Sequence, residues 1–487
     1  MARFTSLPPE LIEMICNYIR PMRPMRDRFA ETSHENPIDR DGLQLEWRSL
    51  RNLSVASRYF RTVIVHGGLL HRALIIKGSF HELFNLLKLF KSAPEFALAV
   101  KQLYIHISWC DLGPADLGPG NELPIVMAIK DLGLDYKDAR RKILPDSGGP
   151  STQCYGILTD YWAASIWPHG TPVYSEERTI RERCITRYGI LVKLILTQMT
   201  SLEDIGADIM SSSVLGPRIN EYAHREFIPN LSHLRSISLR GPKGSGLYGS
   251  ALDFLMRLRP VKHLYIDTIT SKYNPFFTLV GVLYNVTTLI LRDSTFIPKD
   301  LEMILRRCAP LSTFKYCVTD GQRRSLSLPC EVVAALRAWH GKTLRTLCLR
   351  FLPVGGNNYD PVYSASDSLI SSLRGFDVLE SLWVDLDAVH GGSSGGPSPA
   401  NFHTLPWIIG PPESFVERLP GTLKRVFFFV PGRTSGWDDS VVWLARAGDK
   451  FPGLTDILYY NAFRNCTFRM VRRRPFRCPF VPALQWD

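Results

Sequence analysis

The sequence predicts an α/β fold in which a helix and a short strand alternate in repeated units. Two observations predict it: one short apolar pattern keeps returning along the chain, and segments with helical periodicity stand between its copies. The composition agrees, because 45% hydrophobic and 21% charged residues in a chain of 487 are typical of folded globular proteins.

The recurring pattern is apolar-x-x-apolar-x-apolar. Its middle apolar residues Ile237, Leu264, Leu289 and Phe314 are 25 to 27 residues apart, and later steps lengthen to between 31 and 44 residues. The shorter steps match a leucine-rich-repeat period, and the longer ones need inserted loops. The copies are LRSISL (234–239), VKHLYI (261–266), VTTLIL (286–291), LSTFKY (311–316), LRTLCL (344–349), LESLWV (379–384), LKRVFF (423–428) and LTDILY (454–459), with outlying copies VKQLYI (100–105) and LEDIGA (202–207).

Amphipathic segments predict helices between these strands, at residues 250–258, 299–308, 330–339 and 366–374. Stacked helix–loop–strand units share one core, with parallel strands on the concave face and helices on the convex face. The arrangement resembles an irregular leucine-rich-repeat solenoid that lacks an asparagine ladder. A doubly wound α/β domain with the same alternation is the alternative.

The repeat-like region is predicted to span residues 66–487. Residues 110–189 fit no repeat unit, so we interpret them as an insertion. Residues 390–400, with the sequence HGGSSGGPSPA, are predicted to form a flexible loop because they are rich in glycine, serine and proline.

The N-terminal residues 1–65 are predicted to be helical. In LPPELIEMICNYI (7–19), Leu11, Ile15 and Ile19 lie on one stripe of a helix that begins at two prolines. The apolar spacing resumes in WRSLRNLSVASRYFRTVIV (47–65). Helices this short cannot bury a stable core of their own, so they need a partner.

These two segments resemble the F-box, a helical motif by which substrate receptors bind the adaptor subunit of SCF-type ubiquitin ligases. The first segment matches the motif's L-P-x-E-L start, and the second matches its L-x-x-L-x-x-x-S-R-x-F-R end. The gap between them is longer than in the compact motif, which predicts an inserted loop at about 21–45; fungal members with repeat-bearing C-termini often carry such a stretched form. The resemblance implies adaptor contacts by Leu7, Pro8, Leu11, Ile15, Ile19, Leu50, Leu53, Ser57, Arg58 and Phe60.

The resemblance implies a non-catalytic substrate receptor. It would bind the SCF adaptor, through it the cullin and RING subunits, and a protein substrate through the repeats, with no cofactor. The alternative is a repeat scaffold outside any ligase, whose N-terminal helices cap the solenoid.

Strand alternation places every second residue of each strand on the concave surface. Aromatic and arginine side chains there are the types that protein interfaces favour. We therefore expect the substrate to contact Tyr265, Arg292, Arg350, Trp383, Phe427 and Tyr460. For Phe427, burial as ordinary core is an equal alternative.

The formal charge of +12 favours an acidic or phosphorylated partner. Nucleic acid is not the expected partner, because no recognition module accompanies the charge. The sequence shows no phosphate-binding loop, zinc-protease helix or nucleophile elbow. Its ten cysteines form no C-x-x-C pair, so we expect them to be buried thiols. The N-terminus lacks the pattern of a signal peptide, so we expect a cytoplasmic or nuclear location. No apolar segment approaches the length of a membrane helix, so we expect no membrane span.

Overall fold

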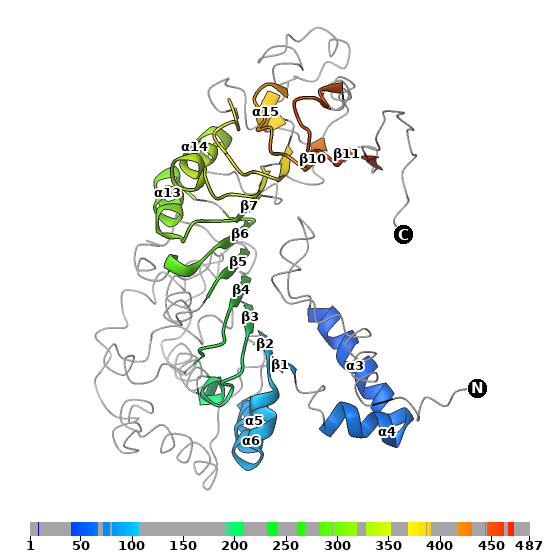
Figure 1. Cartoon of the computed structure of the whole chain (residues 1–487). Coiled ribbons are helices and arrows are strands. Elements are labelled where there is room, and N and C mark those ends of the chain that lie inside the picture. Colours follow the sequence, from blue (N-terminus) through cyan, green and yellow to red (C-terminus); the bar gives the residue numbers. More distant parts are fainter. Residues whose placement is uncertain are drawn as a thin grey trace, which may run out of the picture. The chain divides into compact units, whose positions relative to one another are not determined.

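The structure is a computed structural model of the whole chain (Figure 1). The chain divides into two compact units. The first unit comprises Met1–His263 with Phe277–Val282, and the second comprises Leu264–Phe276 with Leu283–Asp487. The residues described are 8, 40–66, 72–77, 80–106, 191–192, 194–208, 231–240, 261–267, 283–294, 296–318, 328–351, 369–385, 387–390, 416–430, 444, 446–461 and 466–471.

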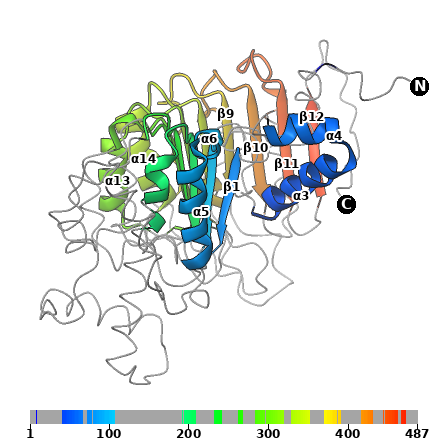
Figure 2. The ribbon, with the colours of Figure 1, turned by 90° about the horizontal axis from the view of Figure 1, so that it is seen from below.

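The first unit combines N-terminal helices with parallel strands. Figure 2 shows α5 lying beside β1, with α6 next to α5. Strands β1 to β4 pair in chain order, and each pair is parallel. The elements are α3 (Arg40–Ala56), α4 (Arg58–Arg61), the π-helix η2 (Thr62–His66), β1 (Ala73–Lys77), α5 (Phe80–Ser92), α6 (Pro94–Ala99), β2 (Gln102–His106), β3 (Asp204–Asp208) and β4 (Ser236–Arg240).

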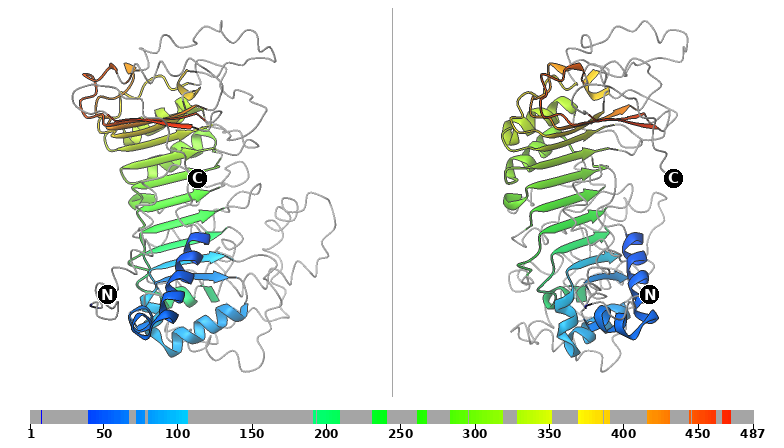
Figure 3. Two further views of the ribbon diagram at one scale, coloured as in Figure 1. Left: turned by 90° about the vertical axis from the view of Figure 1, so that its right-hand side faces the viewer. Right: turned by 45° about the vertical axis from the view of Figure 1, so that its right-hand side comes forward.

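The second unit continues the same alternation. Its strands lie side by side in Figure 3. From β6 to β11 successive strands pair in parallel, whereas β12 is antiparallel to β11. The elements are β5 (His263–Asp267), the 3₁₀ helix η7 (Leu283–Asn285), β6 (Thr288–Arg292), α13 (Pro298–Arg307), β7 (Thr313–Cys317), α14 (Pro329–His340), β8 (Thr346–Arg350), β9 (Ser381–Asp385), α15 (Asp387–His390), β10 (Arg425–Val430), β11 (Asp456–Asn461) and β12 (Cys466–Val471).

All ten copies of the apolar pattern form strands, which confirms the strand predictions. The second and third apolar residues of the pattern point into the core: Leu289, Phe314 and Leu347 are fully buried and lie opposite one another in register. The fold is therefore α/β with parallel strands in chain order, as in a repeat solenoid. Strands β1 and β12 were not predicted.

Carbonyls that directly precede nine of the described strands join successive repeats. The Ser312 carbonyl accepts hydrogen bonds from the backbone N–H groups of Arg345 (2.9 Å) and Thr346 (3.0 Å) in the next repeat. We call these acceptors the register carbonyls. They belong to Arg72, Lys101, Glu203, Arg235, Thr287, Ser312, Arg345, Glu380 and Lys424.

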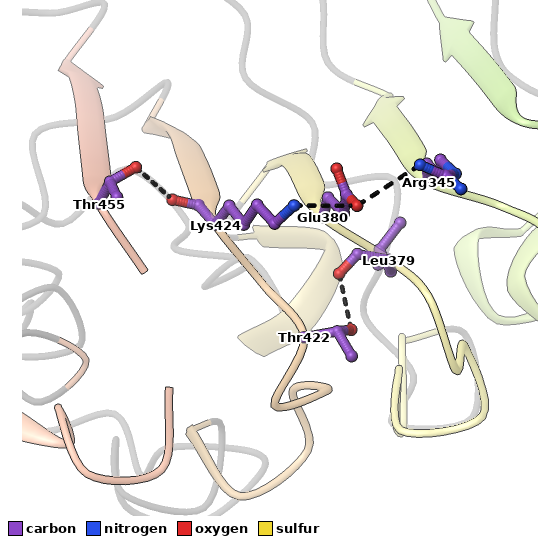
Figure 4. A network of polar contacts seen from close by, with 6 residues as sticks. All are labelled: Arg345, Leu379, Glu380, Thr422, Lys424 and Thr455. Carbon is purple, nitrogen blue, oxygen red and sulfur yellow. Dashed lines mark hydrogen bonds and ion pairs between the residues drawn. The ribbon is translucent and has the colours of Figure 1, made fainter. Parts of the chain in front are cut away.

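Side chains reinforce the same strand ends. The hydroxyls of Thr343 and Thr422 each donate to the carbonyl of the first leucine of the preceding copy, at 3.0 and 2.8 Å. Figure 4 shows that Glu380 lies between the side chains of Arg345 and Lys424, with its Oε1 at 3.7 and 3.0 Å from their nitrogens. These ion pairs are partly exposed to water, so the backbone and hydroxyl bonds contribute more to register than the charges do.

Helices α13 and α14 lie next to each other on one side of strands β6 to β8 (Figure 1). Each begins at a proline, where the missing N–H costs no intrahelical hydrogen bond. The Glu331 carboxylate accepts from the Leu328 N–H at 2.7 Å, which stabilises the start of α14. The predicted helices at 299–308 and 330–339 are confirmed within one or two residues.

The prediction of a helix at 366–374 is wrong over its described part, because residues 369–374 form no helix. The Ile370 and Leu373 N–H groups donate to the Ala388 and Arg418 carbonyls, so they are not available for intrahelical bonds. The serines here compete for backbone groups as well: the Arg374 N–H donates to the Ser372 hydroxyl.

Other predicted segments lie partly or wholly outside the described residues. Helix α3 begins at Arg40, so the last residues of the loop predicted at 21–45 are helical. The insertion at 110–189 and the loop residues 391–400 lie outside the described residues. The predicted domain boundary near residue 65 stays a prediction. Within the described residues, no helix is both long and apolar enough to cross a lipid bilayer.

A buried histidine joins α13, α14 and β7. His340 ends α14, its Nε2 donates to the Leu305 carbonyl at 2.9 Å, and its Nδ1 accepts from the Leu311 N–H at 3.2 Å. Nδ1 must therefore be unprotonated. Burial lowers the pKa of His340 below its usual value, because the charged imidazolium would lose its hydration.

We predict that His340→Gln destabilises the protein in a pH-dependent way. The folded state has the lower pKa, so the stability from neutral His340 is fully present above the unfolded pKa of about 6.5 and is lost as pH falls below it. Near neutral pH, the variant should lose on the order of 1–3 kcal/mol of unfolding free energy, because buried backbone groups lose a partner. Urea denaturation from about pH 7.5 down to about pH 5.5 measures this loss, which should shrink as pH falls.

The control is His233→Gln, at an exposed histidine of the first unit. It should leave the unfolding free energy unchanged at each pH. A loss in His340→Gln that stays constant across the pH range would contradict the prediction.

Candidate functional site

The N-terminal residues predicted to contact an adaptor are only partly described. Leu50 is fully buried, and Arg58 and Pro8 are exposed. Intermediate exposure is found for Leu53, Ser57 and Phe60, all in or between α3 and α4. Leu7, Leu11, Ile15 and Ile19 lie outside the described residues. The structure therefore places the second half of the motif on two consecutive helices, and the adaptor contacts stay predictions.

The predicted substrate contacts lie on the face of the second unit's strands that points away from the core residues. We call this the second face. It carries two rows of side chains, which the strand register defines. The first row is Ile290, Lys315, Cys348, Trp383, Phe427 and Leu458, and the second includes Arg292, Cys317, Arg350, Asp385 and Phe429.

The six predicted contact residues differ in exposure. Tyr265 and Arg350 are buried, at 2% and 7% exposure. Arg292, Trp383 and Phe427 are half-buried, and the side chain of Tyr460 lies outside the described residues. Trp383 on β9 and Phe427 on β10 are therefore register partners, and each side chain keeps part of its surface exposed to solvent.

Two cations on the second face each lie over an aromatic ring two strands away. The Lys315 ammonium is 5.1 Å from the ring centre of Trp383, and it passes the intervening Cys348. The Arg350 guanidinium is 4.4 Å from the ring centre of Phe429. A cation near an aromatic face is attracted by the ring's quadrupole, most strongly when both are shielded from water.

Burial also changes the proton affinities on this face. It lowers the pKa of Lys315, which is 1% exposed, because the ammonium loses its hydration. Burial raises the pKa of the Tyr265 phenol, and the nearby Asp267 carboxylate raises it further. Tyr265 therefore stays a neutral phenol at physiological pH.

Two buried thiols also lie on the second face. The Cys317 and Cys348 sulfurs are 3.7 Å apart, and the contact with Cys348 lowers the pKa of Cys317. The two residues are diagonal neighbours, because Cys317 pairs with Arg350 and Cys348 with Lys315. Diagonal Cα atoms are about 7–8 Å apart, which is too far for an unstrained disulfide. Among the residues described, no group of three or more histidine, cysteine or carboxylate side chains could hold a metal ion.

Asp385 is an acidic residue of the second face that accepts a hydrogen bond from the backbone. It is 1% exposed, and its Oδ2 accepts from the Phe351 N–H at 2.6 Å, just beyond the end of β8. The sequence shows that Asp385 directly follows the last apolar residue of one copy of the pattern. It also shows that Lys315 directly precedes the last apolar residue of another copy. Neither residue was predicted to matter, because no sequence signal separates a buried charge from a surface charge at such positions.

A hollow of about 270 Å³ lies beside α14, away from both rows. The aliphatic part of Arg337 lies against Gly375, where an added Cβ would come within 2.4 Å of the Arg337 Cδ. Glycine at 375 is therefore required for this side-chain position. The lining residues are Cys330, Glu331, Val333, Ala334, Arg337, Ser371 and Ser372.

Comparison with known proteins does not assign a family. No protein-family model matches the chain, and no curated protein sequence matches it. One similar solved structure is the crystal structure of the Rad7 and Elc1 complex in yeast, at 12% identity and a TM-score of 0.29. The match covers 80% of this chain and 93% of that chain. At this TM-score, the likeness assigns neither a function nor a partner to this chain.

We predict that Asp385→Ala destabilises the second unit more than Asp385→Asn does. Alanine leaves the buried Phe351 N–H without an acceptor, at a cost of about 1–3 kcal/mol, whereas the asparagine carbonyl oxygen can still accept. Guanidinium denaturation followed by fluorescence measures both losses. Asp377→Ala, at an exposed aspartate, is the control. Equal losses for alanine and asparagine would show that the hydrogen bond is not the cause.

Proposed function

We propose that this protein is the substrate-recognition subunit of an SCF-type ubiquitin ligase. In this proposal the N-terminal motif binds the ligase adaptor, the repeat strands bind a protein substrate, and the chain itself catalyses nothing. The observation that carries the proposal is that an F-box-like motif and a strand-repeat region occur in one chain. The motif's second half is helical, at α3 and α4, and every predicted repeat strand is present.

The half-buried residues of the second face support its role as a substrate surface. Trp383 and Phe427 are adjacent, and large aromatic side chains dominate the binding energy of many protein interfaces. The charge of +12 favours an acidic or phosphorylated substrate. Buried Tyr265 and Arg350 contribute by holding their neighbours in place rather than by direct contact.

We expect the ligase adaptor to co-purify with the full chain and Leu11→Ala/Ile15→Ala to abolish this association. The two substitutions remove the apolar stripe that the motif would present to the adaptor. Affinity purification with quantitative detection of the adaptor, cullin and RING subunits measures it. Leu98→Ala is the matched control, because Leu98 is an apolar residue of α6 with 51% exposure. If the double variant has an unchanged circular dichroism spectrum and still binds the adaptor as strongly as the wild type does, the proposal is wrong.

Substrate binding is expected to depend on the second face and not on the N-terminal motif. Trp383→Ala should reduce the proteins that co-purify in addition to the ligase subunits, while the adaptor itself is retained. Trp339→Ala is the control, because Trp339 is an exposed tryptophan on α14 that contacts Arg306 rather than the second face. If both variants lose the same co-purifying proteins, or neither does, the second face is not the substrate surface.

A repeat scaffold outside any ligase is the second candidate function. It is favoured by the full burial of Leu50, because a cap on the repeats would bury this side chain in the same way. Under this alternative no adaptor co-purifies, and removal of residues 1–65 makes the remaining chain insoluble.

A further inference from the structure

The Trp383 ring on the second face has a buried cation on one of its two sides. The Lys315 ammonium lies over the ring, 5.1 Å from its centre. Lys315 is 1% exposed, whereas Trp383 is half-buried. Because the ammonium occupies one side of the ring, a binding partner can approach Trp383 only from the other side or at its edge.

A second buried cation lies close to the neighbouring ring. Phe427 is the register partner of Trp383 and is half-buried as well. Its ring packs edge to face against the buried Phe429, with 4.5 Å between the ring centres. The Arg350 guanidinium lies 4.4 Å from the centre of that Phe429 ring. We call Trp383 and Phe427 the aromatic pair, and each of its rings therefore has a buried cation nearby.

The charges around the aromatic pair do not cancel. On strands β7 to β10 the two rows carry two cations, Lys315 and Arg350, and one carboxylate, Asp385. Their formal charges leave one positive charge in excess. Asp385 is 1% exposed, and its Oδ2 accepts from the Phe351 N–H, so a partner cannot reach this carboxylate. A partner over the pair meets aromatic surface with positive charge behind it.

This arrangement changes what the exposed rings can bind. An exposed aromatic ring ordinarily attracts lysine and arginine side chains, which approach to within about 6 Å of the ring centre. A second cation on the free side of Trp383 would stand about 10 Å from the Lys315 ammonium, and at that distance the repulsion weakens binding by on the order of tenfold. An apolar or aromatic side chain carries no charge and avoids this repulsion.

We propose that the aromatic pair binds an apolar or aromatic side chain of a substrate protein and rejects a lysine or arginine side chain at the same place. Lys315 is then a specificity-determining residue that acts through the Trp383 ring without touching the substrate. The inference rests on the proposed function, because it takes the second face as the substrate surface.

The first experiment measures the charge at Trp383 without any substrate. The chain has ten tryptophans, so the Trp383 signal is the fluorescence difference between the wild type and Trp383→Phe. Iodide and caesium quench this signal at one ionic strength, and each quenching constant is divided by that for free tryptophan. Iodide should quench Trp383 about twofold or more better than caesium does, because the local charge is positive.

Three variants assign this preference to one side chain. Lys315→Met removes the cation and should abolish the preference for iodide, whereas Lys315→Arg keeps a cation and should retain it. Lys299→Met removes the same charge at an exposed lysine of α13 and should change nothing. Circular dichroism checks that each variant is folded, and the wild-type comparison of iodide with caesium needs no variant at Lys315.

The second experiment measures the selectivity itself. Random twelve-residue peptides displayed on phage are selected on the full chain, and those that also bind Trp383→Ala are removed. In a recovered peptide, each apolar residue is replaced in turn by norleucine and by lysine, and fluorescence anisotropy measures both affinities. At the residue that contacts the pair, norleucine should bind about tenfold more tightly than lysine or better, and Lys315→Met should lower this ratio about tenfold.

The outcomes separate this inference from the proposed function. Equal quenching by iodide and caesium in the wild type would overturn the inference, and so would a preference for iodide that persists in Lys315→Met. A peptide that depends on Trp383 but has the same affinity ratio in wild type and Lys315→Met would keep the substrate surface and overturn the inference alone. If no peptide depends on Trp383, both the inference and the substrate role of the second face are wrong, while adaptor co-purification tests the ligase role separately.

Discussion

The register carbonyls are the constraint on which the described structure depends. Each accepts two backbone N–H groups from the following repeat, so one residue at each strand start sets the position of the next strand. A shift of one residue would exchange the two faces of a strand, and leucine and phenylalanine side chains would leave the core. The bonds use only backbone atoms, which explains why the residue at this position varies freely among arginine, lysine, glutamate, serine and threonine.

Once register is set, the chemistry of the second face follows from it. Lys315 reaches Trp383, and Arg350 reaches Phe429, because the rows place each aromatic ring two strands from a cation with a smaller side chain between them. Burial then lowers the pKa of Lys315 and raises that of Tyr265. A side chain in these rows can contact a partner only with the part of its surface that remains exposed. The half-buried Trp383 and Phe427 are therefore better suited to binding than the buried Arg350 is.

Helix α3 is buried on one side and exposed on the other. Leu50 is fully buried, whereas Val55 is 81% exposed. The two residues are five positions apart, which places them on nearly opposite sides of a helix with 3.6 residues per turn. The burial of one side of α3 therefore leaves the other side in contact with solvent.

The sequence by itself determined the positions of ten strands and two helices. The apolar pattern located ten strands because each has two apolar core residues two positions apart, and α13 and α14 were visible from the amphipathic spacing of their apolar residues. Only the tertiary structure decided that residues 369–374 are not helical, since carbonyls from distant residues take their N–H groups. It also decided that Tyr265, Lys315 and Arg350 are buried while Val55 is exposed. Burial depends on which segments pack against a residue, and that is a property of contacts far apart in the chain rather than of the local pattern.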